Sequence, residues 1–330
     1  MPQERRIFEG PHPYELVALP DRVWRARPRG HHHLATDAWV GRLRLTLTAL
    51  RPVHVFSGFR ELRRDQNREE IIGLLPRGAY EGTTTRVLPG MSLKGAVRGV
   101  AEAISPSCVL QADREVRRFL APQQGPCRRS EALCPACRIF GALGYQGHLQ
   151  FADVPVAEEA VAPVRLHQLW TPGRRNAMHK YVREGKVLGR KFYRHGQPEA
   201  GGELREAVRE GQRLTAEMHF WHLGRAELGL VLAALGLDPD HPFALKLGGG
   251  KPLGYGSVRV EVQEVTLKQG GGGWRRGGED LEGEASGRFV RECVLRARQD
   301  GWVEEKGLAR VAAVLREERL RVGSPGRDPY

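Results

Sequence analysis

The sequence has no apolar run long enough to cross a membrane, since none approaches the roughly 18 residues that a spanning helix needs. Its first residues, Met-Pro-Gln-Glu-Arg-Arg, also lack the apolar segment of a signal peptide. Cysteine is scarce, at 5 of 330 residues, which argues against the disulfide framework of a secreted protein. These absences predict a cytoplasmic protein without a membrane segment, whose cysteines are free thiols or metal ligands.

Common catalytic motifs are absent as well, because there is no G-x-S-x-G, no H-E-x-x-H and no paired-carboxylate motif. A glycine-rich stretch surrounds Lys251, but Leu245 and Pro252 stand where a P-loop needs Gly and Ser or Thr. A strand is predicted to follow this stretch, so it is not a dinucleotide-binding turn that opens a helix either. Asp65 is the only Asp between Arg51 and Met91 and could bind Mg²⁺ or Mn²⁺ for phosphodiester cleavage.

Acidic residues are few relative to basic ones. The chain has 39 Asp and Glu against 52 Lys and Arg, which gives a net charge of +13 and a pI near 10.0. Such an excess predicts a polyanionic partner, most simply nucleic acid, although a basic surface without function is the alternative. Hydrophobic residues make up 40% of the chain, enough for a substantial core.

Hydrophobic periodicity predicts an α+β fold. Strands are expected over 39–50, 149–156, 164–169, 214–223, 243–247 and 258–267, and helices over 92–104, 226–237 and twice within 286–321. Without the predicted insertions at 105–148 and 171–212, the order is strand, helix, strands, helix, strand, which is the ferredoxin-like or RRM-like plan. Residues 1–38 then form an N-terminal extension, 39–268 the main domain, and 279–330 a C-terminal helical extension. Residues 51–87 are expected to be a long connection, and the tail after Val322 to be disordered.

The predicted helix 92–104 has two different faces. An apolar stripe (Leu93, Val97, Val100 and Ile104) belongs to the core, and the opposite face carries glycines with cations beside them. A bare face at a helix N-terminus suits an anionic backbone, whereas the alternative is close packing against another protein element. The candidate RNA-binding residues here are Ser92 (also the predicted N-cap), Lys94, Gly95, Arg98 and Gly99.

Four of the five cysteines fall within 30 residues. Cys134 and Cys137 have the C-x₂-C spacing of a zinc knuckle, and Cys108 and Cys127 are the candidates to complete a structural Zn²⁺ site. His148 is a substitute ligand, and a redox pair or unrelated thiols are the alternatives. Cys293 is expected to be a small core residue.

Two further segments are candidates for RNA contact. Five glycines around Lys251 allow close approach to an RNA backbone, unless they form only a tight hairpin turn. The window 165–196 mixes nine Lys and Arg with aromatics and has one acid, Glu184, which suits single-stranded nucleic acid better than a solvated loop. The candidates in the two segments are Gly249, Gly250, Lys251, Gly254, Tyr255 and Gly256, and Arg174, Arg175, Lys180, Arg190, Lys191, Tyr193 and His195.

Three motifs together resemble the RAMP superfamily of CRISPR-associated proteins, and in particular the backbone (seventh-family) subunits of type III effectors. The motifs are Leu88-Pro-Gly-Met-Ser-Leu-Lys-Gly-Ala-Val-Arg98, Cys134-Pro-Ala-Cys-Arg-Ile-Phe-Gly141 and Gly249-Gly-Lys-Pro-Leu-Gly-Tyr-Gly-Ser257. The resemblance implies an RRM-like palm, a zinc-bearing insertion and a hairpin thumb, for which 171–212 is the candidate. It implies binding of crRNA and target RNA alongside other effector subunits. It also leaves open metal-dependent target cleavage through Asp65, or crRNA processing through His54 without metal.

Overall fold

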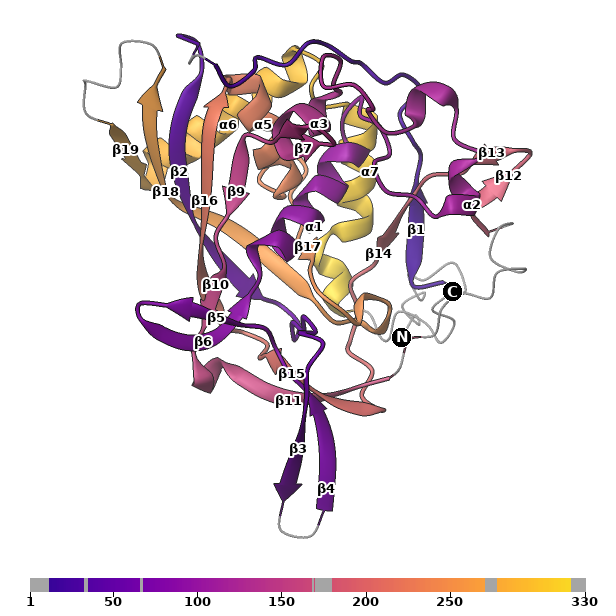
Figure 1. Ribbon diagram of the computed structural model, residues 1–330, viewed down its shortest axis with the longest axis vertical. Helices are drawn as coiled ribbons and strands as arrows, with labels where there is room; N and C mark the ends of the chain where they lie inside the picture. The colour runs from indigo at the N-terminus through magenta and orange to yellow at the C-terminus, as the bar shows by residue number, and fades with distance from the viewer. Residues whose placement is uncertain are drawn as a thin grey trace, which may run out of the picture.

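The computed structural model describes residues 12–32, 35–65, 68–167, 169, 180–270 and 278–321. Helices and strands are mixed along the chain, which confirms the predicted α+β class (Figure 1). None of the described helices combines the length and the hydropathy needed to cross a membrane.

The centre of the fold is an antiparallel sheet with strand order β17–β18–β2–β16–β9, and β19 pairs with β18. Its strands are β2 (Trp39–Ala49), β9 (Leu149–Phe151), β16 (Arg213–Leu223), β17 (Leu245–Lys246), β18 (Ser257–Gln269) and β19 (Glu279–Glu282). Leu43, Leu45 and Leu47 of β2 are buried, whereas Arg44 points to the other face and pairs with Glu264 at 3.1 Å. This alternation orients one face of the sheet toward the core.

Helices α1 (Gly90–Ala103) and α5 (Arg225–Ala234) lie beside this sheet (Figure 1). The elements β2, α1, β9, β16, α5 and β18 follow one another along the chain in the predicted order. The start of α1 differs from the prediction, because Pro89 and not Ser92 is its N-cap. No side chain of the helix caps it; instead Asp153 accepts a hydrogen bond from Gly90 N at 2.8 Å. Asp153 lies in the gap that divides the predicted strand 149–156 into β9 and β10 (Val154–Val156).

The predicted long connection 51–87 is wrong as a loop, because it contains four strands. They are β3 (Arg60–Asp65), β4 (Arg68–Gly73), β5 (Arg77–Tyr80) and β6 (Thr83–Leu88). Hairpin β3–β4 projects from the body of the molecule (Figure 1). Its one apolar cross-strand pair, Leu62 with Ile71, is exposed. Strands that are exposed and highly charged do not show the apolar alternation by which strands are predicted.

The remaining strands form small sheets. Strand β4 pairs in parallel with β15 (Glu203–Val208), which pairs with β11 (Val161–Leu166), while β10 pairs with β6. Three two-stranded ribbons are β1 (Tyr14–Val17) with β14 (Arg190–Tyr193), β12 (Val182–Arg183) with β13 (Lys186–Val187), and β7 (Gly141–Ala142) with β8 (Tyr145–Gln146). Strands β12 to β15 therefore occupy the described part of 171–212.

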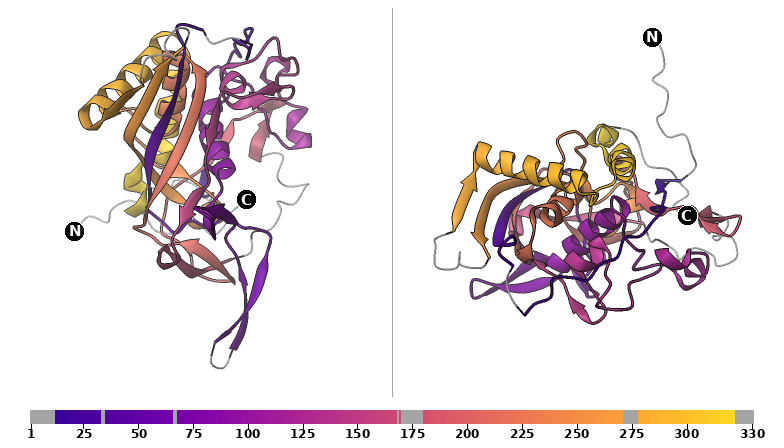
Figure 2. Two further views of the ribbon diagram at one scale, coloured as in Figure 1. Left: turned by 60° about the vertical axis from the view of Figure 1, so that its left-hand side comes forward. Right: turned by 90° about the horizontal axis from the view of Figure 1, so that it is seen from above.

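The two predicted C-terminal helices are α6 (Gly283–Gln299) and α7 (Glu305–Leu315), and α6 runs beside α5 (Figure 2). Their apolar residues join the main core, where Cys293 is fully buried, as predicted. Two short helices, α2 (Arg114–Arg117) and α3 (Pro135–Phe140), belong to the cysteine-bearing insertion. Residues 322–330, predicted to be a disordered tail, lie outside the described residues.

Candidate metal centre and anion-binding cleft

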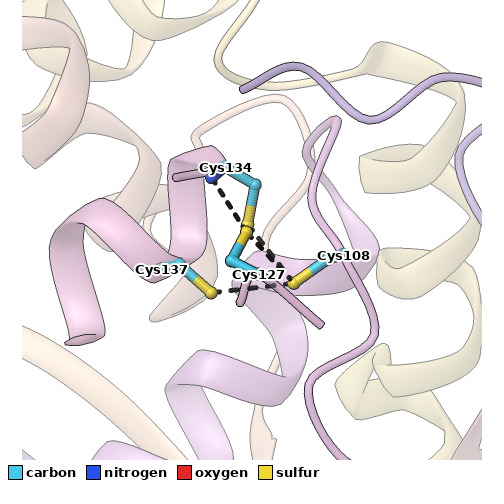
Figure 3. Close-up of side chains that lie close together, drawn as sticks. All are labelled: Cys108, Cys127, Cys134 and Cys137. Carbon is cyan, nitrogen blue, oxygen red and sulfur yellow. Dashed lines mark hydrogen bonds between the residues drawn. The ribbon is translucent and has the colours of Figure 1, made fainter. Parts of the chain in front are cut away.

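The four cysteines of the insertion gather into one cluster (Figure 3). All four are buried, and their sulfur atoms lie within 4.8 Å of one another. The Sγ of Cys108 is 3.6 Å from that of Cys137, 3.9 Å from that of Cys127 and 3.5 Å from that of Cys134. Four sulfurs bound tetrahedrally at about 2.3 Å from one ion would be about 3.8 Å apart, so the cluster fits a zinc-sized ion. Cys108 and Cys127, rather than His148, complete the set.

The cysteines have local support for negative charge. Cys134 is the N-cap of α3 and Cys137 lies in its first turn, where helix N–H groups favour a thiolate. Hydrogen bonding with Cys108 lowers the pKa of Cys127 and lowers that of Cys134 to about 7. Hydrogen bonds within the cluster raise the pKa of Cys108 and Cys137. Proton sharing of this kind ends when an ion binds, because zinc takes its ligands as thiolates.

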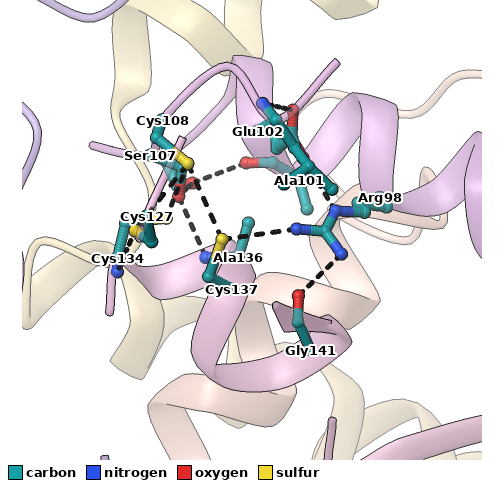
Figure 4. A network of polar contacts seen from close by, with 12 residues as sticks. Arg98, Ala101, Glu102, Ser107, Cys108, Cys127, Cys134, Ala136, Cys137 and Gly141 are labelled. Carbon is teal, nitrogen blue, oxygen red and sulfur yellow. Dashed lines mark hydrogen bonds and ion pairs between the residues drawn. The ribbon is translucent and has the colours of Figure 1, made fainter. Parts of the chain in front are cut away.

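Arg98 lies directly behind the cluster (Figure 4). Its Nη2 donates to Cys137 Sγ at 3.3 Å, its Nη1 donates to Gly141 O at 2.8 Å, and its Nε donates to Glu102 Oε1 at 2.8 Å. The guanidinium therefore offsets part of the negative charge of a four-thiolate site. Arg98 turns toward the cysteines and not toward the glycine face of α1, beside which it was expected.

A cleft of about 190 Å³ lies on the glycine face of α1. Gly95 and Gly99 line it from α1, and residues Arg190–Tyr193 line it from β14. Lys246 lines it from β17, and Lys251 lines it from the glycine-rich segment 248–256, which we call the glycine loop. A Cβ atom at Gly95 or Gly99 would meet nothing within 4 Å. The alternative explanation for these glycines, close packing against another element, therefore has no counterpart in the described part of the chain.

Three lysines at the cleft form no ion pair with any described residue. Lys246 Nζ donates to Tyr255 O at 2.6 Å and to Ser257 Oγ at 3.4 Å, and burial lowers its pKa well below the ordinary value. Burial also lowers the pKa of Lys251. Lys191 Nζ lies 4.1 Å, 4.9 Å and 5.3 Å from the ring centres of Tyr14, Tyr181 and Tyr193, respectively. An arriving anion would stabilise the charged form of the buried lysines.

Lys246 was not identified from the sequence as a candidate. The available signal is a lysine between two leucines in a buried strand, immediately before the glycine cluster. Ser92 and Lys94, which were predicted, do not line the cleft. Ser92 lies in the first turn of α1, and Lys94 Nζ donates to Leu149 O at 3.0 Å.

The glycine loop is shaped mainly by its own packing. Gly254 has a φ of +89°, and a Cβ there would lie 2.5 Å from Gln197 O. Gly250 and Gly256 are likewise buried at positive φ, whereas Gly249 is exposed. Tyr255 is buried and its hydroxyl donates to Arg165 O at 3.0 Å. Most of these residues therefore position Lys251, which begins a short 3₁₀ helix.

Several predicted residues lie elsewhere. His54 is buried with its Nδ1 2.6 Å from Glu206 O, and Asp65 ends β3 opposite Arg68 at the turn of the projecting hairpin. Arg174 and Arg175 lie outside the described residues, and Lys180 directly precedes Tyr181. His148 stacks with His31 and is 2.6 Å from Tyr145 Oη.

His195 is fully enclosed, which corrects its assignment to an RNA-contacting set. Its Nδ1 lies 2.8 Å from Ser257 Oγ and its Nε2 lies 2.9 Å from Leu315 O. Burial lowers its pKa to about 3. A neutral imidazole with no exposed surface has a structural role.

The buried histidine predicts loss of stability in acid. Its pKa is about 3 in the folded state and about 6.5 when unfolded. Protonation therefore favours unfolding, and the free energy of unfolding falls as the pH drops from about 6.5, by about 2 kcal/mol at pH 5. Denaturant titrations from pH 7 to pH 5 measure this. His195→Gln is expected to flatten the profile, and an unchanged slope would contradict the assignment; His148, whose pKa burial lowers to about 4, adds a separate contribution.

The fold and the two sites define an α+β protein with a cysteine cluster suited to a metal such as zinc and a cationic cleft. The family model of the RAMP superfamily matches residues 46–259, so the chain belongs to the RAMP superfamily. This confirms the resemblance at the level of the superfamily and indicates a CRISPR-associated role in RNA binding or processing. A comparison with curated proteins found no match.

Proposed function

We propose that the chain is a crRNA-binding backbone subunit of a type III-like CRISPR effector, and that the guide strand lies in the cleft between α1, β14 and the glycine loop. The observation that carries this proposal is the convergence at one cleft of three segments, each predicted separately to contact RNA. The antiparallel order β18–β2–β16–β9, with α1 and α5 beside it, supports the RRM-like palm that such a subunit needs.

The chemistry of the cleft suits a sugar–phosphate backbone. Gly95 and Gly99 leave the floor bare, and Lys246 and Lys251 supply cations that have no carboxylate partner among the described residues. Phe192 and Tyr193 add aromatic surface on which an unpaired base can stack. These contacts read no sequence, as expected where base pairing with a target supplies specificity.

Filling the glycine face tests this proposal. Gly99→Leu is expected to stabilise α1 by up to about 1 kcal/mol, because leucine is a good helix former. The same side chain enters the cleft and is expected to weaken binding of single-stranded RNA about tenfold. Fluorescence anisotropy with labelled RNA and thermal unfolding measure the two effects.

Gly287→Leu is the matched control, because Gly287 lies in α6, is exposed, and a Cβ there also meets nothing within 4 Å. It should raise stability and leave RNA binding unchanged. Wild-type RNA affinity in Gly99→Leu would exclude the glycine face as the floor of the RNA site.

A further inference from the structure

A second hollow, of about 510 Å³, lies on the outside of the cysteine-bearing insertion. Four arginines line it: Arg25, Arg117, Arg128 and Arg129. No carboxylate is among the described residues that line it. Arg25 Nη2 donates to Gln123 O at 2.8 Å and to Gly125 O at 2.9 Å, which fixes one rim. The other three guanidiniums are exposed and form no ion pair with any described residue. We call this feature the arginine hollow.

The floor of the arginine hollow is apolar. Its other lining residues are Leu120, Ala121, Pro122, Pro126 and Ala132, together with Gly125. A hollow of this size accommodates a ligand of nucleotide dimensions. Guanidinium groups match the geometry of phosphate oxygens and also stack on planar rings. An apolar floor with arginines around it thus suits a base and its phosphates.

A third, smaller hollow, of about 240 Å³, neighbours both the arginine hollow and the cleft. That hollow shares Leu120 with the arginine hollow and shares Arg190 and Lys191 with the cleft. Asp113 is the one carboxylate that lines it from the described part of the chain, and it accepts a hydrogen bond from Glu115 N at the start of α2. The three hollows are therefore neighbours, and we call the surface that they span, from the glycine face of α1 to the insertion, the track.

We propose that the arginine hollow binds phosphate-bearing nucleotides of the same RNA strand that the cleft holds. This inference rests on the proposed function and extends it, since it assigns a role in RNA binding to the insertion that the cysteines organise. Cys127 directly precedes Arg128 and Arg129, so a metal at the cluster would also hold two of the four arginines in place.

The test compares two double variants of the full chain. Arg128→Ala with Arg129→Ala removes two charges from the hollow, and Arg114→Ala with Arg118→Ala removes two exposed charges from the same insertion outside it. Anisotropy is measured with single-stranded RNA of about 8 and about 30 nucleotides, the shorter being too short to follow the whole track. Thermal unfolding and zinc content show that both proteins remain folded.

The hollow variant is expected to bind the longer RNA about tenfold more weakly, and its log affinity should fall less steeply with log salt, by about 1.4 in slope. Both double variants should bind the shorter RNA as wild type does. Equal losses in the two variants, or none in either, would overturn the proposal. The proposal would also be overturned if the arginine substitutions weakened binding of AMP or of oligoglutamate and left the affinity for the longer RNA unchanged. If Gly99→Leu weakens RNA binding and the hollow variant does not, this inference fails and the proposed function stands; if neither variant weakens binding, both fail.

Discussion

Cys134→Ala is expected to abolish stable zinc binding and to lower the free energy of unfolding by about 4 kcal/mol. The four sulfurs join the loop at Cys108, the loop at Cys127 and the start of α3, and all four belong to the main hydrophobic core. Losing one ligand removes the link between these segments and leaves three buried thiols that repel one another when ionised. Zinc content of the purified protein and urea unfolding measure the two effects.

Cys293→Ala is the control, because Cys293 is equally buried but lies outside the cluster. It should keep its zinc and lose only the packing of one sulfur atom, about 1 kcal/mol. A chelator should lower the unfolding midpoint of the wild type and of Cys293→Ala but not that of Cys134→Ala. Equal zinc content in the two variants would contradict the assignment of the metal site.

The elements of the core could be predicted from the sequence because the residue pattern that identifies each one lies within a short segment. The alternating leucines of β2, the apolar stripe of α1 and the C-x₂-C pair each show their pattern within a few residues. Hairpin β3–β4 was missed because its strands carry mostly charged side chains and gain order by pairing with each other and with β15. The pairing of β4 with β15 joins strands that are far apart in the sequence.

Side-chain direction was the other limit of prediction. Arg98 lies one helical turn from Lys94, so periodicity placed both beside the glycines, yet Cys137 and Glu102 draw the Arg98 guanidinium to the far side. His195 follows several cations in the sequence but is enclosed by Ser257 and Leu315, which come from β18 and α7. Lys246 lines the cleft from β17, a strand whose apolar neighbours in the sequence are typical of the protein core. The contact of Arg98 with Cys137 and both contacts of His195 are distant in sequence.

Glu102 connects the two sites of the molecule. One oxygen of its buried carboxylate accepts from Arg98 Nε at 2.8 Å, and the other accepts from Arg190 Nη2. Arg98 continues to Cys137 in the cysteine cluster, and Arg190 belongs to β14 at the cleft. This carboxylate therefore balances two partly buried guanidiniums and fixes β14 relative to α1. Its removal would leave both cations without their buried partner, which is far more costly than losing a surface pair.

Glu102→Gln is accordingly expected to lower the free energy of unfolding by about 3 kcal/mol. Glu292→Gln, which breaks an exposed pair with Arg225, should cost under about 1 kcal/mol. The double variant Glu102→Gln with Arg190→Met should lose much less free energy of unfolding than the sum of the losses in the two single variants. The reason is that it removes the Arg190 charge together with the carboxylate that balances it. Additive costs in this double-mutant cycle, measured by urea unfolding, would show that Glu102 and Arg190 act independently. A large coupling energy would mean that the position of β14, and with it one wall of the cleft, depends on a carboxylate that also orients the arginine behind the cysteines.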